Sequence, residues 1–261
     1  MEGVSKSHSM WRLWRLWGFG IWKIYRVLHL HLPGGCYLLH LMQIGAIFDW
    51  DGVVIDSSQA HEASWERLAK EEQLPLFEGH FKQGFGRKNE FIIPHILQWT
   101  QPADHAATQR LGERKEFHYR EILRECGIEP LPGVRDLLEA LRSQGISCAV
   151  GSSTSRLNLE TVIGLLQFEP FFQAIVSAED VEHGKPQPDV FLTAAERLQR
   201  APQHCIVFED AHVGIEAGLA GGMKVVAVAT THPLATLQQA HCAVERLTDV
   251  SVDKLIDLCK Q

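Results

Sequence analysis

Several common sequence patterns are missing from this 261-residue chain, and each absence excludes a class of protein. Its six cysteines form no Cys-x-x-Cys pair or metal-type cluster, which excludes a zinc module and favours reduced thiols in a cytoplasmic protein. No glycine-rich dinucleotide or Walker motif follows an apolar strand-like run. Internal repeats and low-complexity tracts are also absent. What remains is an ordinary globular composition, with 45% hydrophobic and 22% charged residues.

The chain also lacks an excess of positive charge. Its formal net charge is -7, so it has no broad positive field to gather a nucleic acid, and no nucleic-acid partner is expected. A small anionic substrate would instead need a local cationic pocket. The composition therefore favours a small phosphorylated metabolite or a similar anion over a polyanion.

No stretch of about 18 uncharged apolar residues occurs, so a membrane-spanning helix is not expected. Residues 1–41 differ from the rest in being basic and rich in tryptophan, with Arg12, Arg15, Trp11 and Trp14 as examples. A basic amphipathic helix on a membrane surface is one interpretation of this leader. A mis-assigned upstream start or a disordered extension is the favoured one. A chain that begins at Met42 is therefore expected to fold and to keep full activity.

From Met42 onward, short apolar runs alternate with amphipathic segments, as in βαβ units around a parallel sheet. Strands are predicted at residues 44–48, 146–150, 174–176, 205–208 and 223–228. The alternation lapses into helical patterning between Asp56 and Leu131. A helix then opens at Leu131-Pro132-Gly133 and runs to about Arg142. The prediction is an α/β core, residues 42–56 and 131–261, with a helical cap inserted at 57–130.

Two acidic pairs lie at the ends of predicted strands, where a parallel sheet binds its ligands. Asp49 and Asp51 follow the first strand, and Glu209 and Asp210 end a later one. Carboxylates this close together repel each other unless a cation or a substrate offsets the repulsion. Gly52 lets the chain turn sharply, so that the second aspartate can reach back over the first. Hard carboxylate ligands of this kind indicate Mg²⁺.

Two further segments supply groups that suit a phosphate. Ser152-Ser153-Thr154 follows another predicted strand, where hydroxyls and backbone N–H groups can cradle phosphate oxygens. Lys185 lies in a stiff frame, Gly-Lys-Pro-Gln-Pro-Asp, which favours a positioned charge. Taken alone, either segment could be a plain helix cap or a surface lysine. Their order along the chain, together with the two acidic pairs, carries the prediction.

The order Asp-x-Asp, Ser, Lys and Glu-Asp resembles the motif set of the haloacid dehalogenase superfamily. The resemblance covers nearly all of the chain from Met42. The segments Phe-Asp-x-Asp-Gly-Val-x-x-Asp-Ser and Gly-Lys-Pro-x-Pro-Asp are similar to those of the branch that holds beta-phosphoglucomutases and phosphatases with a helical cap. This resemblance implies a Rossmann-like core and phosphoryl transfer through an aspartyl-phosphate.

The resemblance also implies a role for each motif residue. Asp49 would be the nucleophile, and Asp51 the general acid that later acts as the base. Mg²⁺ would be held by the Asp49 side chain, the Asp51 backbone carbonyl and Asp210, with Glu209 in or next to the shell. The transferring phosphoryl oxygens would be bound by Ser152, Ser153 and Lys185.

Three residues are candidates for contacts with the rest of the substrate. Arg87 ends the sequence Gly-Phe-Gly-Arg, which fits a family loop that reaches the substrate from the cap. His61 stands where the mutases place a histidine that helps to couple cap closure to catalysis. Arg156 stands where the mutases use an uncharged polar residue, and a second cationic contact is expected of it. Each of the three also has a plain alternative as a structural or surface residue.

Gln83 departs from the mutase pattern, because those enzymes carry a lysine directly before the cap glycine, and Lys82 lies one place too early. The missing phosphate clamp favours a phosphatase that hydrolyses a small phosphomonoester, such as a sugar phosphate. A beta-phosphoglucomutase is the alternative. A non-catalytic phosphate-binding relative is an alternative of another class, although such a protein should have lost a catalytic position. The identity of the substrate and the oligomeric state stay open.

Overall fold

The structure is a computed structural model that describes residues 44–84 and 87–260. The predictions for the leader, residues 1–41, lie outside the described residues. From Ile44 onward the chain forms one compact unit. Within the described residues, no helix is both long enough and apolar enough to cross a bilayer.

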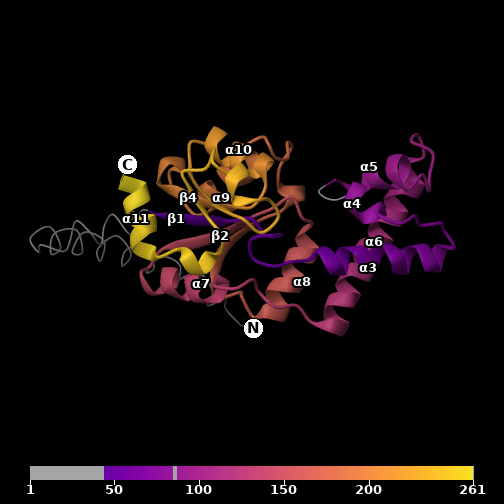
Figure 1. Cartoon of the computed structure of the whole chain (residues 1–261), viewed down its shortest axis with the longest axis horizontal. Coiled ribbons are helices and arrows are strands. Elements are labelled where there is room, and N and C mark those ends of the chain that lie inside the picture. The colour runs from indigo at the N-terminus through magenta and orange to yellow at the C-terminus, as the bar shows by residue number, and fades with distance from the viewer. Residues whose placement is uncertain (1–43, 85–86, 261) are drawn as a thin grey trace, which may run out of the picture. The chain divides into compact units, whose positions relative to one another are not determined.

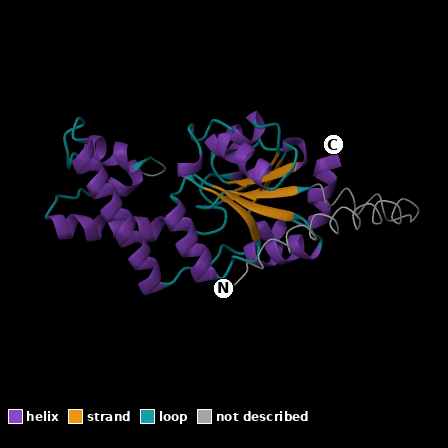
Figure 2. Ribbon diagram, turned by 180° about the vertical axis from the view of Figure 1, so that it is seen from behind, coloured by secondary structure: helices purple, strands orange, loops and turns teal. Residues whose placement is uncertain are grey.

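The core of this unit is a six-stranded parallel sheet with the order β3-β2-β1-β4-β5-β6 (Figure 2). Its strands are β1 (Gly45–Phe48), β2 (Ser147–Gly151), β3 (Phe172–Val176), β4 (Cys205–Glu209), β5 (Lys224–Val228) and β6 (Cys242–Val244). The central strand β1 pairs with β2 on one side and β4 on the other, with Phe48 opposite Val150 and Phe208. The strand order therefore switches direction at β1, and this is where such sheets bind ligands.

Five helices cover the sheet: α7 (Val134–Ser143), α8 (Arg156–Leu166), α9 (Asp189–Arg197), α10 (His212–Ala220) and α11 (Val252–Lys260). Helices α9 and α10 lie on one face, and α7 and α8 lie on the other (Figure 1). Short 3-10 turns occupy Ala178–Asp180, Pro202–His204, Leu234–Thr236 and Leu247–Asp249. The central strands are buried on both faces, which explains why β1 and β4 read as continuous apolar runs.

The sequence prediction of a parallel α/β core is confirmed, and the five predicted strands are present with boundaries shifted by at most two residues. The short edge strand β6 was not predicted. It has only three residues, all half-buried, so it lacks the apolar run that marks the central strands. The predicted helix after Leu131 is α7, which starts at Val134 because Gly133 adopts a left-handed φ of 88° directly before it.

A helical segment lies between β1 and α7, and we call residues 57–130 the cap. It contains α3 (Ser58–Glu72), α4 (His80–Gly84), α5 (Asn89–Phe91), a π-helical turn (Ile92–Ile96) and α6 (His105–Cys126). The cap has its own apolar cluster, in which Trp65 and Leu68 of α3 pack with Ile93 and Leu111. The two chain segments that connect it to the core run side by side, since Leu131 N–H donates to the Val54 carbonyl at 2.9 Å.

Candidate active site

Three carboxylates meet at the carboxyl ends of β1 and β4. Asp49 follows β1, Glu209 ends β4 and Asp210 comes next, and one oxygen of each lies within 4.8 Å of the others. All three residues are buried, with at most 7% exposed. The backbone fixes their positions, because the Asp49 N–H continues the sheet ladder by donating to the Phe208 carbonyl at 3.0 Å. Three buried carboxylates with hard oxygen donors fit a small divalent cation such as Mg²⁺.

Two glycines leave room for the side chains of this cluster, because each lies in close contact with one of its carboxylates. A Cβ at Gly214 would lie 1.6 Å from Glu209 Oε1, and a Cβ at Gly52 would lie 2.1 Å from Asp210 Oδ2. Gly52 also has a φ of 84°, which disfavours any side chain there. The two acidic side chains therefore occupy space that only glycine leaves free.

Lys185 supplies the only ammonium group that the described residues bring into direct contact with this cluster. Its Nζ donates to Asp49 Oδ1 at 2.5 Å and to Glu209 Oε1 at 2.7 Å. The side chain is 7% exposed, and its Nζ lies 4.8 Å from the centre of the Phe191 ring. Burial opposes its charge, but Asp49 and Glu209 outweigh burial and raise the pKa of Lys185. Lys185 is therefore a fixed cation in the acidic cluster.

Burial, together with the neighbouring carboxylates, raises the pKa values of both aspartates in the cluster. Burial raises the pKa of Asp210 to about 7, and the charge of Glu209 acts in the same direction, against Thr231 and Lys185. Burial likewise raises the pKa of Asp49, and Lys185 offsets it only in part. One ammonium thus does not neutralise three carboxylates, and the site retains an affinity for a further cation.

Asp51, which is not part of the cluster, accepts hydrogen bonds from hydroxyl groups of two different loops. The Ser57 hydroxyl donates to Asp51 Oδ1, and the Thr154 hydroxyl donates to Oδ2 at 2.5 Å. Thr154 belongs to the loop after β2, so Asp51 touches the predicted phosphate loop directly. The sequence interpretation noted Thr154 only as one hydroxyl of that loop and missed this contact.

The loop after β2 has the form expected of a phosphate-binding turn. Ser152 is buried, its N–H donates to the Val176 carbonyl at 3.0 Å, and its hydroxyl accepts from the Thr154 N–H at 3.1 Å. Ser153 is exposed. Helix α8 starts four residues after Ser152, at Arg156. The helix N-terminus therefore directly follows the hydroxyl-rich turn.

His61 lies on the cap next to the Asp51 segment. Its backbone N–H donates to the Ser57 carbonyl at 3.0 Å, and its ring stacks on Tyr119 with 4.0 Å between centres. Nδ1 of His61 lies 2.6 Å from the buried Lys115 Nζ. Burial and the charge of Lys115 lower the pKa of His61 to about 4, against Asp51 and Glu116. His61 is thus a neutral acceptor for Lys115 near neutral pH, and no pattern in the sequence indicated Lys115, which lies 54 residues away.

The structure does not bring the two predicted arginines to the cluster. Arg87 is exposed, and its guanidinium lies 4.6 Å from the centre of the Phe91 ring. Arg156 contacts Asp180 and the Ile175 carbonyl, and Glu160 at 3.8 Å. In this structure Arg156 is paired with Asp180, and its contact with a phosphate stays a prediction. Arg87 stays a prediction.

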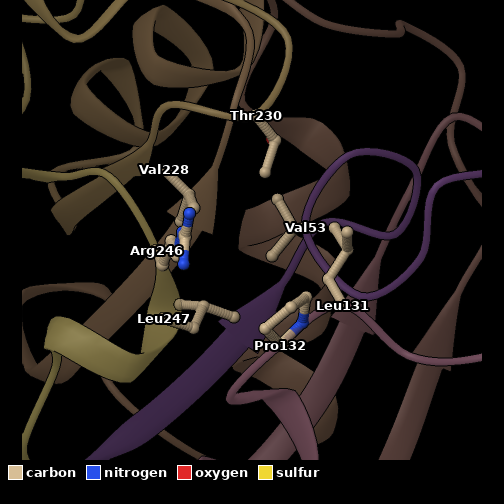
Figure 3. Close-up of a pocket in the computed structure, with 7 residues that line it drawn as sticks. All are labelled: Val53, Leu131, Pro132, Val228, Thr230, Arg246 and Leu247. Atoms are coloured by element: carbon tan, nitrogen blue, oxygen red, sulfur yellow. The ribbon is translucent and has the colours of Figure 1, made fainter.

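Figure 3 shows a small pocket beside the connecting segments, and none of the residues that line it belongs to the acidic cluster. It has a volume of about 30 Å³, room for a single water molecule. Its lining is mostly apolar: Val53, Leu131, Pro132, Val228, Thr230, Arg246 and Leu247 (Figure 3). A substrate of metabolite size does not fit there, so this pocket is not the binding site.

Comparison with known proteins decides the family. The family model described as haloacid dehalogenase-like hydrolase matches residues 46–228. The chain belongs to this family. The match includes β1 to β5, the cap and all the residues of the acidic cluster.

Relatives of this haloacid dehalogenase-like hydrolase support the same assignment. It is 37% identical over 220 residues to the chloroplastic 5-amino-6-(5-phospho-D-ribitylamino)uracil phosphatase of Arabidopsis thaliana, and the match covers 83% of this chain and 57% of that one. It is 30% identical to the beta-phosphoglucomutase of Bacillus subtilis (strain 168) over 80% of this chain and 92% of that one.

A solved family IA, variant 3 hydrolase from Entamoeba histolytica superposes with a TM-score of 0.75 at 29% identity, over 84% of this chain and 100% of that one. Together with the family match, these likenesses make the protein an enzyme of the phosphoric monoester hydrolase type.

Proposed function

We propose that the protein is a Mg²⁺-dependent phosphatase that hydrolyses a small phosphomonoester, such as a sugar phosphate, through an aspartyl-phosphate on Asp49. One observation carries the proposal: Asp49, Glu209 and Asp210 meet in a buried cluster with Lys185 bonded to the first two. Such a cluster supplies a nucleophile, a fixed cation and carboxylate ligands in one place. The relative from Arabidopsis thaliana, named as a phosphatase of a phosphoribityl compound, supports the substrate class.

In the first half of the reaction, a carboxylate oxygen of Asp49 attacks phosphorus and the ester P–O bond breaks. The leaving alkoxide takes a proton from Asp51, which Ser57 and Thr154 hold in place. Lys185 balances the negative charge of the transferring group and keeps Asp49 oriented. The turn at Ser152 and Ser153 offers a hydroxyl group and N–H groups to the phosphoryl oxygens.

In the second half, Asp51 accepts a proton from water as the water oxygen attacks phosphorus. The bond between phosphorus and Asp49 breaks, inorganic phosphate leaves and the carboxylate of Asp49 is restored. A bound Mg²⁺, held by Asp49, Asp210 and the Asp51 carbonyl next to Glu209, would supply positive charge to the phosphoryl oxygens. Atoms and charges balance without any oxidant or second substrate besides water.

The alternative is a sugar-phosphate mutase. The 30% identity to a beta-phosphoglucomutase supports it, as does the position of His61 at the start of the cap, bonded to Ser57. Against it, both Lys82 and Gln83 are exposed, and Arg156 is already bonded to Asp180. With fewer cations to hold a second phosphate, hydrolysis by water is the better supported outcome.

A panel of phosphomonoesters with and without Mg²⁺ tests this proposal. We expect release of inorganic phosphate that requires Mg²⁺ and is abolished by Asp49→Asn. Asp257→Asn on the exposed face of α11 is the matched control and should keep full activity. Glucose 1-phosphate, primed with the bisphosphate, separates the two candidates: glucose 6-phosphate without free phosphate would favour the mutase. Full activity of Asp49→Asn would refute both.

A further inference from the structure

A second polar network lies away from the acidic cluster and joins the cap helix α6 to the core helix α8. Glu116 on α6 is its centre. Its Oε2 accepts from Asn158 Nδ2 at 2.6 Å, and its Oε1 accepts from Lys115 Nζ at 3.0 Å and from Asn89 Nδ2 at 2.8 Å. Asn158 Oδ1 in turn accepts from Arg120 Nη1 at 2.8 Å. Both ends of the Asn158 amide therefore bond to α6.

The burial of this network makes its hydrogen bonds important. Asn158 is only 2% exposed, and the Lys115 side chain is 4% exposed. A buried amide or ammonium is costly unless each polar atom has a partner. Because the partners of Asn158 lie on α6, the amide is satisfied in this dry setting only while α6 is packed against α8. The interaction is thus specific to the docked arrangement of cap and core.

Glu116 links the docking contact to the groups that face Asp51. Lys115, which it binds, contacts His61, and the backbone of His61 is bonded to Ser57, the hydroxyl partner of Asp51. Asn89, which it also binds, lies two residues after Arg87. The Glu116 carboxylate therefore connects Lys115 and Asn89 of the cap to Asn158 on α8, the helix that follows the turn at Ser152.

The charge of Glu116 is stable over the working range of an enzyme. Burial opposes ionisation, but Lys115, His61 and the hydrogen bonds from Asn89 and Asn158 lower the pKa of Glu116 to about 2. Glu116 therefore stays ionised near neutral pH and remains an acceptor for Asn89 and Asn158.

We propose that Glu116 and Asn158 are positioning residues, which dock α6 on α8 and so place His61 and Lys115 beside Asp51. Neither residue touches the reacting atoms. Their effect is on the fraction of molecules in which the cap is docked, and so on how readily a substrate is held in the reactive arrangement. The kinetic test of this inference rests on the proposed phosphatase activity, but its structural test does not.

The test compares Asn158→Leu and Glu116→Gln in the full chain with Mg²⁺. Leucine keeps the size of Asn158 but removes both of its hydrogen bonds. Glutamine keeps the shape of Glu116 but replaces one acceptor oxygen with an N–H₂ group, which then faces either Asn158 or the donors of Lys115 and Asn89. We expect KM to rise and kcat/KM to fall about tenfold or more, the effect of losing about 1.4 kcal/mol of buried hydrogen bonding. Glu125→Gln, which breaks an exposed ion pair with Arg67 on the same cap helices, is the matched control and should behave as the wild type.

Small-angle X-ray scattering without substrate gives the second readout. Both variants should show a larger radius of gyration than the wild type and Glu125→Gln, because the cap spends more time away from the core. Because both changes remove the hydrogen bond between Glu116 and Asn158, the double variant should be impaired by less than the sum of the two single variants. If Glu116→Gln does not fold, Asn158→Leu and Arg120→Gln provide the comparison.

Two results would overturn the inference. One is wild-type KM and wild-type scattering for Asn158→Leu. The other is a lowered unfolding free energy with unchanged kinetics, which would show a purely structural role. If the wild type hydrolyses no phosphomonoester, the proposed function fails instead, and the scattering comparison alone decides the role of Glu116 and Asn158.

Discussion

The crowded carboxylates predict that the metal-free protein becomes less stable as the pH rises. The pKa of Asp210 is about 7 in the folded protein, against 3.8 for an ordinary aspartate. Between these values the folded state keeps a proton that the unfolded chain has released. The contribution of Asp210 to the free energy of unfolding must therefore fall as the pH rises through this window and level off above about pH 7.

The size of the effect follows from the width of the window. One group contributes at most about 1.4 kcal/mol per pH unit, so a window of about three units gives an upper limit of roughly 4 kcal/mol. His61 works in the opposite direction, because its lowered pKa leaves it neutral in the folded state while the unfolded chain is protonated up to about pH 6.5. The total slope is thus a sum of opposing parts.

A difference measurement isolates the part due to the cluster. Urea unfolding in EDTA, at several pH values between 4 and 8, gives the free energy of unfolding of the wild type and of Asp210→Asn as a function of pH. The difference between the two curves cancels the contribution of His61, which both proteins share. We expect the stability of the wild type relative to Asp210→Asn to decrease by up to roughly 4 kcal/mol from pH 4 to 7. Mg²⁺ should restore the wild type above pH 7 by binding the ionised carboxylates. A separation that does not change with pH would refute this account of the cluster.

Two further changes, each with a control, test the packing and bonding around the site. Gly214→Ala must displace Glu209, so activity should fall more than tenfold and the unfolding free energy by about 1–3 kcal/mol. Its control is Gly164→Ala in α8, where the nearest atom is 3.8 Å away, and urea unfolding should show a gain of roughly 0.5–1 kcal/mol. Thr154→Val removes one of the two hydroxyl donors to Asp51, so kcat should fall about tenfold with little change in the unfolding midpoint. Thr161→Val, which removes a hydroxyl that bonds only within α8, should leave kcat unchanged. An unaffected kcat in Thr154→Val would show that this hydroxyl does not orient Asp51.

The sequence was sufficient for five of the six strands and for the acidic cluster, because both depend on local patterns. Strands buried on both faces are continuous apolar runs, and parallel strands bring their carboxyl ends to one edge. Asp49, Glu209 and Asp210 could therefore be grouped from their places at the ends of apolar runs. Lys185 could be added because its proline frame marked it as fixed.

The contacts of the cap could not be predicted in the same way. The partners of Glu116 lie 27 and 42 residues away, and Lys115 meets His61 across 54 residues. Such pairs depend on how α3, α6 and α8 pack against one another, and this packing cannot be predicted from a periodic pattern in the sequence. Arg156 is a second example. It lies next to the phosphate loop in sequence, but its guanidinium forms an ion pair with Asp180 on the 3-10 turn Ala178–Asp180, which the sequence did not indicate.

The paired connections between cap and core have a consequence for how this fold can change. Because the chain leaves the sheet beside Val54 and returns beside Leu131, the cap begins and ends at almost the same point. A longer, shorter or wholly different helical insert could be joined there without moving β1. New substrate preferences can therefore be acquired by exchanging the insert while the chemistry at Asp49 stays untouched.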